Sequence, residues 1–279
     1  SNGLKQYLEG SVIASFFTRA LAYCFQLVKE SYIFSLVSRD GLFSRSWQHS
    51  LAARIIKAVY DIPAKFLHPL WLKIKDYCLS SLAVKIIIYF ANTLHIWMGI
   101  FVLFLIASPH KAWSNSYSAL AAAAFLFLYI IRMIVREKAK PVFLAINVFL
   151  FIFMIAIFLA TVLSIAPKES LRLLIFYLTS FIFFTLIILS IESTEQLTQF
   201  LGLVLIGLTI CGLYGTYQGI VGVPINESQI DISLHMGTRG RIWSTFDNPN
   251  NLAEVLVMFL PFYLALSLNS KNWSTKLFW

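Results

Sequence analysis

Residues 142–166 read VFLAINVFLFIFMIAIFLATVLSIA and contain no charged side chain. A helix needs about 20 mostly apolar residues to cross the hydrocarbon core of a bilayer. Strands of a membrane barrel would instead alternate apolar and polar side chains along the sequence. Because this run is long and uniformly apolar, it predicts a transmembrane helix.

The composition of the whole chain agrees with that assignment. Of the 279 residues, 59% are hydrophobic, 16% aromatic and 13% charged. A soluble domain carries about 25% charged residues, so this chain has too few to cover a globule with polar surface. Disorder is excluded as well, since disordered segments are poor in hydrophobic residues. The sequence therefore predicts an all-α, polytopic membrane protein.

Five further apolar runs have the length of a membrane span, so we expect about six transmembrane helices. Together they form a predicted bundle over residues 86–279, in which His95 is expected to face the bundle interior. The six spans are placed at residues 86–107, 117–135, 142–166, 173–191, 199–222 and 252–268.

Residues 1–85 form a different region, a basic arm with eleven Lys or Arg against five Asp or Glu. We expect amphipathic helices on the membrane surface, broken near Gly41 and Pro63, with the cations bound to anionic lipid headgroups. The alternative is a span over residues 12–37. It would bury Arg19 and Lys29 at about 2.5–3.5 kcal/mol each, so we prefer the surface position.

Basic residues in the link between the second and third spans set the expected orientation. Such a cluster stays in the cytoplasm. Alternation of the spans then places the N-terminus in the cytoplasm and the loop 223–251 outside. The cluster consists of Arg132, Arg136, Lys138 and Lys140.

Cysteine spacing and overall charge argue against several other classes. Cys24, Cys78 and Cys211 lie far apart and form no metal-binding or disulfide pattern, so we expect no metal and no cofactor. The net charge of +9 fits cytoplasmic loops and lipid headgroups. No stretch interleaves basic and aromatic residues, so we expect no nucleic-acid partner.

The fifth span is rich in glycine. Gly215 and Gly219 are four residues apart, a spacing that lets a second helix approach closely. A tight helix crossing is the preferred interpretation, and a cleft for a lipid tail remains the alternative.

Polar residues gather in the last predicted outer loop and at the start of the sixth span. Asn248 followed by Pro249 is a typical helix start, and Asn251 with Glu254 fits a capping box. The helix terminus and Arg241 would together form an anion site at the outer leaflet. The alternative is that Arg241 and Arg239 anchor the loop to lipid headgroups.

The segment Arg241-Ile-Trp-Ser-Thr-Phe-Asp-Asn248-Pro249-Asn250 resembles the motif Arg-x-x-Ser/Gly-x-x-x-Asn-Pro-Asn of the O-antigen ligase and polymerase superfamily, which includes proteins described as bicarbonate transporters. The resemblance implies a partial membrane glycosyltransferase of the GT-C type that needs no metal. Such an enzyme transfers a glycan from an undecaprenyl-diphosphate carrier to an acceptor glycan at the outer face of the bacterial cytoplasmic (inner) membrane, during surface polysaccharide biosynthesis.

The same resemblance assigns roles to residues of the loop. Arg241 would stabilise the leaving diphosphate, with Arg239 as a second cation. Asn248 and Asn250 would shape the loop and bind the sugar or phosphate. Superfamily members place a histidine base in a later outer loop, so we expect this chain, which ends at Trp279, to be the N-terminal portion and inactive alone. His235 is a weak candidate for a substitute base.

Two other functions fit the sequence. A small-anion transporter should show broken helices and polar groups along a pathway. A membrane scaffold would use the basic arm to bind partners or anionic lipid.

Overall fold

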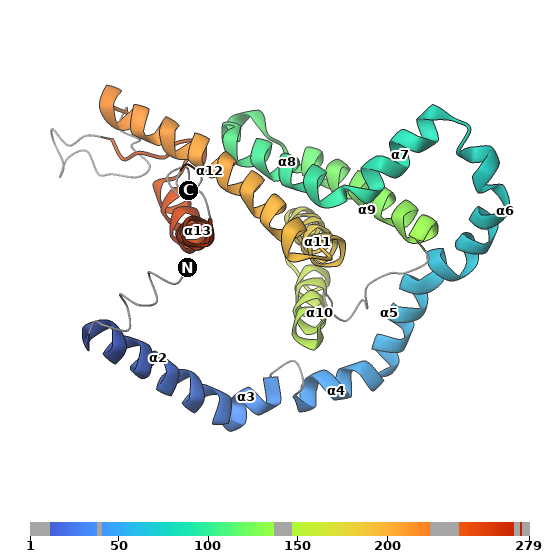
Figure 1. The fold of residues 1–279 in the computed structure, drawn as a ribbon, viewed down its shortest axis with the longest axis horizontal. Coiled ribbons are helices and arrows are strands. Elements are labelled where there is room, and N and C mark those ends of the chain that lie inside the picture. The colour runs from blue at the N-terminus through green and yellow to red at the C-terminus, as the bar shows by residue number, and fades with distance from the viewer. Residues whose placement is uncertain (1–11, 38–40, 137–146, 224–239, 271–273, 275–279) are drawn as a thin grey trace. The chain divides into compact units, whose positions relative to one another are not determined.

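The computed structural model describes residues 12–37, 41–136, 147–223, 240–270 and 274. All regular elements in these ranges are helical, which confirms the predicted all-α class (Figure 1). The chain divides into two compact units. The first comprises residues 1–73 and 136–174, and the second comprises residues 74–135 and 175–279.

The first unit holds the amphipathic helices of the arm and one uncharged helix. Trp47 and Phe43 pack against Phe151 and Phe149, with ring centroids 4.7 and 6.1 Å apart. These contacts join α4 to α10 inside the unit. Its helices are α2 (Val12–Glu30), α3 (Tyr32–Val37), α4 (Leu42–His49), α5 (Leu51–Ile62), the π-helical turn η1 (Pro63–Leu67), the first part of α6 (His68–Cys78), and α10 (Val148–Val162).

The predicted break near Pro63 is wrong. Pro63 has helical dihedral angles, φ −59° and ψ −43°, and η1 connects α5 to α6 without a loop. Proline cannot donate to the carbonyl four residues earlier and its ring crowds that carbonyl. A wider π-helical turn accommodates both effects while the chain stays helical.

The second unit contains most of the membrane-length helices. Four helices of the described residues are long and apolar enough to cross a bilayer, which indicates a membrane-embedded protein. They correspond to the predicted spans 117–135, 173–191, 199–222 and 252–268. In chain order these four are α9 (Asn115–Arg136), α11 (Pro167–Ser190), which begins in the first unit, α12 (Thr194–Val221) and α13 (Pro249–Asn269).

The other two predicted spans differ from what we expected. The run 86–107 is not one straight helix, because α7 (Leu82–Asn92) and α8 (Leu94–Ala107) meet at 73°. At the bend, Tyr89 O accepts from both the amide and the hydroxyl of Thr93, over 3.0 and 2.7 Å. Within 142–166, α10 covers Val148–Val162, and residues 142–146 lie outside the described part of the chain.

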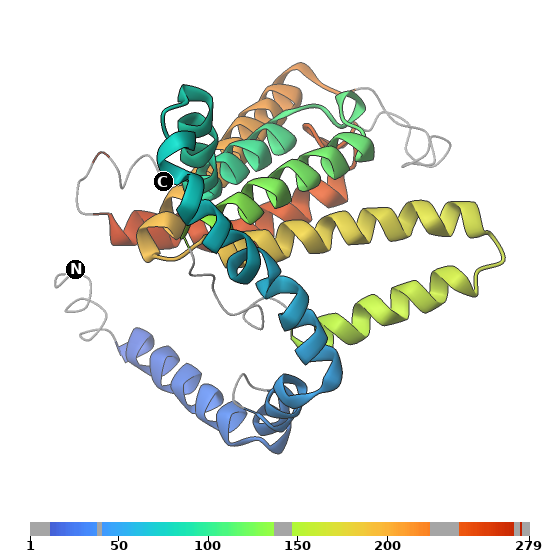
Figure 2. The same cartoon turned by 90° about the vertical axis from the view of Figure 1, so that its right-hand side faces the viewer.

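Helices α8 and α12 lie side by side and run parallel (Figures 1 and 2). A Cβ atom added to Gly207 would come within 3.0 Å of Leu103 Cα, and one added to Gly99 within 2.8 Å of Leu203 Cδ1. The two glycines therefore let the helices approach closely. At one end of the pair, His95 Nε2 lies 3.0 Å from Gln199 Oε1. This confirms that His95, 4% exposed, faces the bundle interior.

Candidate functional site

Three of the predicted site residues lie at the start of α13. They are Arg241, Asn248 and Asn250, in a segment that leads from Gly240 into the helix. The other two, Arg239 and His235, lie outside the described residues.

Asn248 is the N-cap of α13 and Pro249 is its first residue, as predicted. The side-chain Oδ1 of Asn248 accepts a hydrogen bond from Asn250 N over 2.8 Å. The predicted capping box at Asn251 is wrong, because Asn251 already lies inside the helix. The cap falls three residues earlier because Asn248 reaches the second helical N–H and proline suits the first position.

Arg241 is exposed, and its Nη2 donates to Asn250 Oδ1 over 2.9 Å. This bond brings together the arginine and an asparagine of the motif. A guanidinium has five N–H donors, so further donors remain to bind an anion. At the helix terminus itself, Pro249 has no N–H and the N–H of Asn250 is bound to Asn248. An anion at this site would therefore be held mainly by the guanidinium.

A buried glutamine fixes the segment that carries Arg241. Gln218, in the last turns of α12, accepts from Ser244 N at its Oε1 over 2.8 Å. Its Nε2 lies 3.4 Å from Ser244 O and donates to it. Gln218 is 7% exposed and Ser244 is 3% exposed. Both backbone polar groups of Ser244 are thus satisfied by one side chain, as buried polar groups require.

Further hydrogen bonds hold the same segment to α8 and α12. Thr245 Oγ1 donates to Ile106 O over 2.7 Å, a carbonyl in the last turn of α8 that lacks a helical partner. His110 N donates to Thr245 O over 2.9 Å. Ser244 Oγ donates to Cys211 O, and the buried Cys211 thiol lies 3.1 Å from the same hydroxyl.

Two residues of the segment have left-handed backbone conformations. Ser244 has φ 52° and Asp247 has φ 54°. Such angles cost about 1–2 kcal/mol for an L-residue other than glycine, and they persist where the surroundings fix them. For Ser244 the surroundings are Gln218 and Cys211. The segment is therefore held in one defined conformation just before the helix start.

Gly215 and Gly219 of the fifth span contact the segment that carries Arg241 and not a second helix. The preferred prediction of a helix crossing at these glycines is therefore wrong. An added Cβ at Gly215 would lie 3.4 Å from Ile242 Cγ2 and 3.5 Å from Ser244 Cβ. One at Gly219 would lie 3.1 Å from Ile242 Cδ1. The absence of side chains at these two positions lets Ile242 and Ser244 pack closely against α12.

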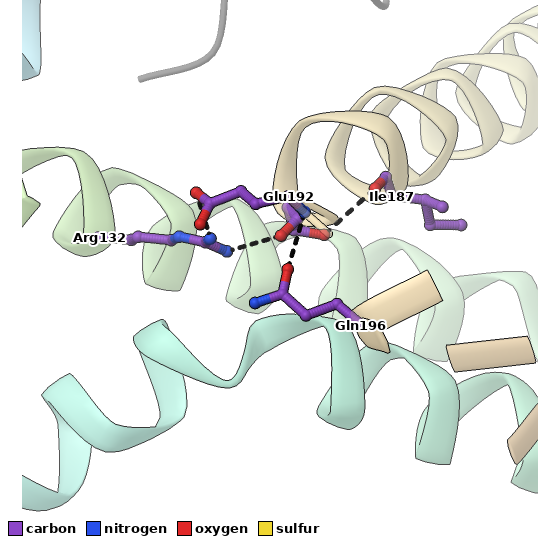
Figure 3. Close-up of polar contacts among 5 residues, drawn as sticks. Arg132, Ile187, Glu192 and Gln196 are labelled. Atoms are coloured by element: carbon purple, nitrogen blue, oxygen red, sulfur yellow. Dashed lines mark hydrogen bonds and ion pairs between the residues drawn. The ribbon is translucent and has the colours of Figure 1, made fainter. Parts of the chain in front are cut away.

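A second polar cluster lies at the junction of α11 and α12 (Figure 3). Arg132 is 3% exposed, and its Nη1 donates to Ser190 O over 3.0 Å. Its Nη2 lies 2.5 Å from Glu192 Oε1. Glu192 N donates in turn to Gln196 Oε1 over 2.7 Å. The prediction that Arg132 belongs to the link between the second and third spans is wrong, because Arg132 lies inside α9 and is buried.

The Arg132 cluster has a structural explanation. A buried guanidinium is stable when it is paired and hydrogen-bonded. Here it binds a carboxylate and also Ser190 O, one of the last carbonyls of α11, which lack helical partners. The cluster therefore ties the end of α9 to the α11–α12 corner.

An apolar cavity of about 460 Å³ lies between α8, α9 and α11. It is lined mainly by aromatic and aliphatic side chains, with Asn115, Ser118, Thr179 and Ser180 as its polar members. Phe101 and Phe183, both in its wall, stack with ring centroids 5.2 Å apart. Leu105 lines it too, next to the carbonyl of Ile106 that Thr245 binds.

Sequence reasoning missed Gln218 and used Arg132 only as a cation of the link, although both are polar residues inside apolar spans, which is itself a signal. Among the described residues, no three His, Cys, Asp or Glu side chains lie close enough to hold a metal ion. Comparison with known protein families, with curated proteins and with solved structures finds no match.

Proposed function

We propose that this chain binds an undecaprenyl-diphosphate-linked glycan at the outer face of a bacterial cytoplasmic membrane, as the donor-binding portion of a glycan ligase or polymerase. The observation that carries the proposal is the exposed Arg241 guanidinium, hydrogen-bonded to Asn250 at the start of α13. Arginine stays charged and binds phosphate oxygens in a fork. The diphosphate would be the leaving group when the glycan passes to an acceptor sugar.

The fixed backbone around Ser244 supports this proposal. A site that stabilises developing charge works best when its donors are already in place. Buried hydrogen bonds hold Ser244 and Thr245 to Gln218, Cys211 and Ile106. The backbone position of Arg241, three residues before Ser244, is thereby restricted. Arg239 would add a second cation, and Asn248 would help shape the site.

The apolar cavity offers a place for part of the lipid carrier. An isoprenoid chain needs apolar walls, and those of this cavity are mostly phenylalanine, leucine and isoleucine. Thr245 binds Ile106, the neighbour of the cavity residue Leu105, so the cavity wall and the Arg241 segment meet at the end of α8.

Sidedness tests the proposal. In a variant with Arg241→Cys, Cys24→Ser and Cys78→Ser, a membrane-impermeant maleimide should label position 241 from outside in intact spheroplasts. Cys211 is fully buried and should stay silent. Labelling at 241 that needs permeabilised membranes would argue against the function, because the donor lipid is used at the outer face.

A small-anion transporter is the second candidate, and the bend between α7 and α8 favours it. Transporters bind substrates at interrupted helices inside the membrane. Asn92 Oδ1 and His95 Nδ1 lie buried near the bend without a hydrogen-bond partner among the described residues. Uptake of labelled bicarbonate into proteoliposomes, lost in His95→Ala, would support this function, and uptake equal to that of empty vesicles would reject it.

A further inference from the structure

A continuous apolar stripe runs along one exposed face of α5, η1 and the start of α6. Its members are 46–70% exposed. Their spacing of three or four residues keeps them on one side of a helix. The stripe consists of Leu51, Ile55, Val59, Ile62, Phe66 and Leu70.

The opposite face of the same helical run is the less exposed one. Ala53 is fully buried, His68 is 8% exposed, and Ile56 and Tyr60 are half-buried. The stripe is therefore the exposed side of this helical run.

Helical continuity through Pro63 keeps the stripe in register. The chain stays helical from Leu51 to Cys78, and the ion pair of Lys65 with Asp61, 3.3 Å long, bridges the start of η1. A break at Pro63 would have allowed the two halves of the stripe to face different directions.

Cations flank the stripe. Residues 50–75 carry five Lys or Arg and one acid, Asp61. Arg54 directly precedes Ile55 in the sequence, and Lys57 stands two positions before Val59. Neither cation forms an ion pair with a described residue. A partner that combines an apolar interior with a negatively charged surface would match this face.

The neighbouring contacts indicate where this face lies. Trp47 and Phe43, just before α5, pack on Phe151 and Phe149 in the first turn of α10. Asn147 caps that turn, and Val148–Val162 carries no charge. The arm therefore meets the first turn of an uncharged helix whose apolar side chains are largely exposed, as those of a helix in contact with lipid are.

We propose that the stripe lies in the headgroup layer of an anionic bilayer, with its apolar side chains among the acyl chains and Arg54 and Lys57 on lipid phosphates. Seven charged residues between Leu51 and Cys78 argue against a spanning position for this run. An amphipathic helix of this kind lies in the interface plane.

Depth-dependent quenching in the full chain tests the proposal. In a Cys24→Ser, Cys78→Ser background, an NBD fluorophore is attached at Val59→Cys or, as the matched control, at Lys57→Cys. The chain is placed in nanodiscs of phosphatidylcholine and phosphatidylglycerol that contain doxyl lipids. Because Lys57→Cys also removes a cation, the two positions are compared by the ratio of quenching from doxyl groups deep in the acyl chains to quenching from doxyl groups near the headgroups, which does not depend on how much of the arm is inserted. We expect this ratio to be higher at position 59 than at position 57.

Charge dependence is measured with the label at position 59. Each cation near an anionic surface contributes about 1 kcal/mol, so Arg54→Gln should lower the ratio of inserted to free arm about fivefold. Phosphatidylcholine alone removes the contribution of both Arg54 and Lys57, so it should lower the ratio further, about thirtyfold. Two results would overturn the proposal: a water-exposed label at 59 in both lipids, or a label shielded from water that doxyl lipids do not quench, which would mean a protein covers the stripe.

Discussion

The side chain of Gln218 binds both backbone polar groups of Ser244, accepting from its N–H over 2.8 Å and donating to its carbonyl. One residue of α12 thereby fixes a segment that lies 26 positions further along the chain. Because Ser244 has a left-handed conformation, this pairing decides the backbone path from Arg241 to Asn248.

Loss of Gln218 should loosen the segment and expose Cys211. Leaving a buried N–H and carbonyl unpaired costs about 1–3 kcal/mol, so Gln218→Ala should open the segment about tenfold more often. Maleimide labelling of Cys211 in a Cys24→Ser, Cys78→Ser background measures this opening. Thr216→Ala is the control, since that exposed hydroxyl binds only a carbonyl of its own helix. Equal labelling rates in the two variants would contradict the anchoring role.

The close approach of α8 and α12 should make Gly207 sensitive to a single methyl group. Gly207→Ala places a Cβ 3.0 Å from Leu103 Cα, a backbone atom that can move only with its helix, so we expect destabilisation of about 1–3 kcal/mol. Gly212→Ala is the matched control, because nothing lies within 4 Å of its added Cβ. Thermal unfolding in detergent should show a lower Tm for the first variant and an unchanged or higher one for the second. Equal Tm values for Gly207→Ala and Gly212→Ala would contradict the close approach of α8 and α12.

The Arg132–Glu192 pair should respond asymmetrically to mutation. Glu192→Ala leaves a guanidinium that is 4% exposed without that carboxylate, whereas Arg132→Leu leaves a carboxylate that is 38% exposed and can be hydrated. We expect the first variant to unfold at a lower temperature than the second, with Glu195→Ala, an exposed acid of the next turn, close to the unchanged protein. A larger effect of Arg132→Leu would show that the arginine matters mainly for packing.

Local signals in the sequence predicted local structure well. Asn248 and Pro249 are neighbours, and their preferences alone place the start of α13. The run of apolar residues likewise predicts α9, α11, α12 and α13, because each helix satisfies its own backbone in lipid. His95 was expected inside the bundle, where it contacts Gln199.

Contacts between distant residues were not predictable in this way. The glycines at 215 and 219 have the spacing of a helix crossing, yet they accept Ile242 and Ser244, and the spacing does not distinguish these partners. A hydropathy pattern also does not predict the bend of 73° at Thr93, because it reports how apolar a run is and not the direction of its axis. The helix also continues through Pro63, because a π-helical turn forms there, and no residue pattern in the sequence predicts such a turn.

Binding of undecaprenyl diphosphate to the detergent-solubilised chain, measured by native mass spectrometry, tests the role of Arg241 most directly. Arg241→Ala should weaken binding about tenfold or more, as expected for a charged hydrogen bond, and Arg241→Lys should have an intermediate effect because it loses the fork. The control is Arg172→Ala, an exposed arginine near the start of α11. Undecaprenyl diphosphate bound equally by the Arg241→Ala and Arg172→Ala variants would contradict the account.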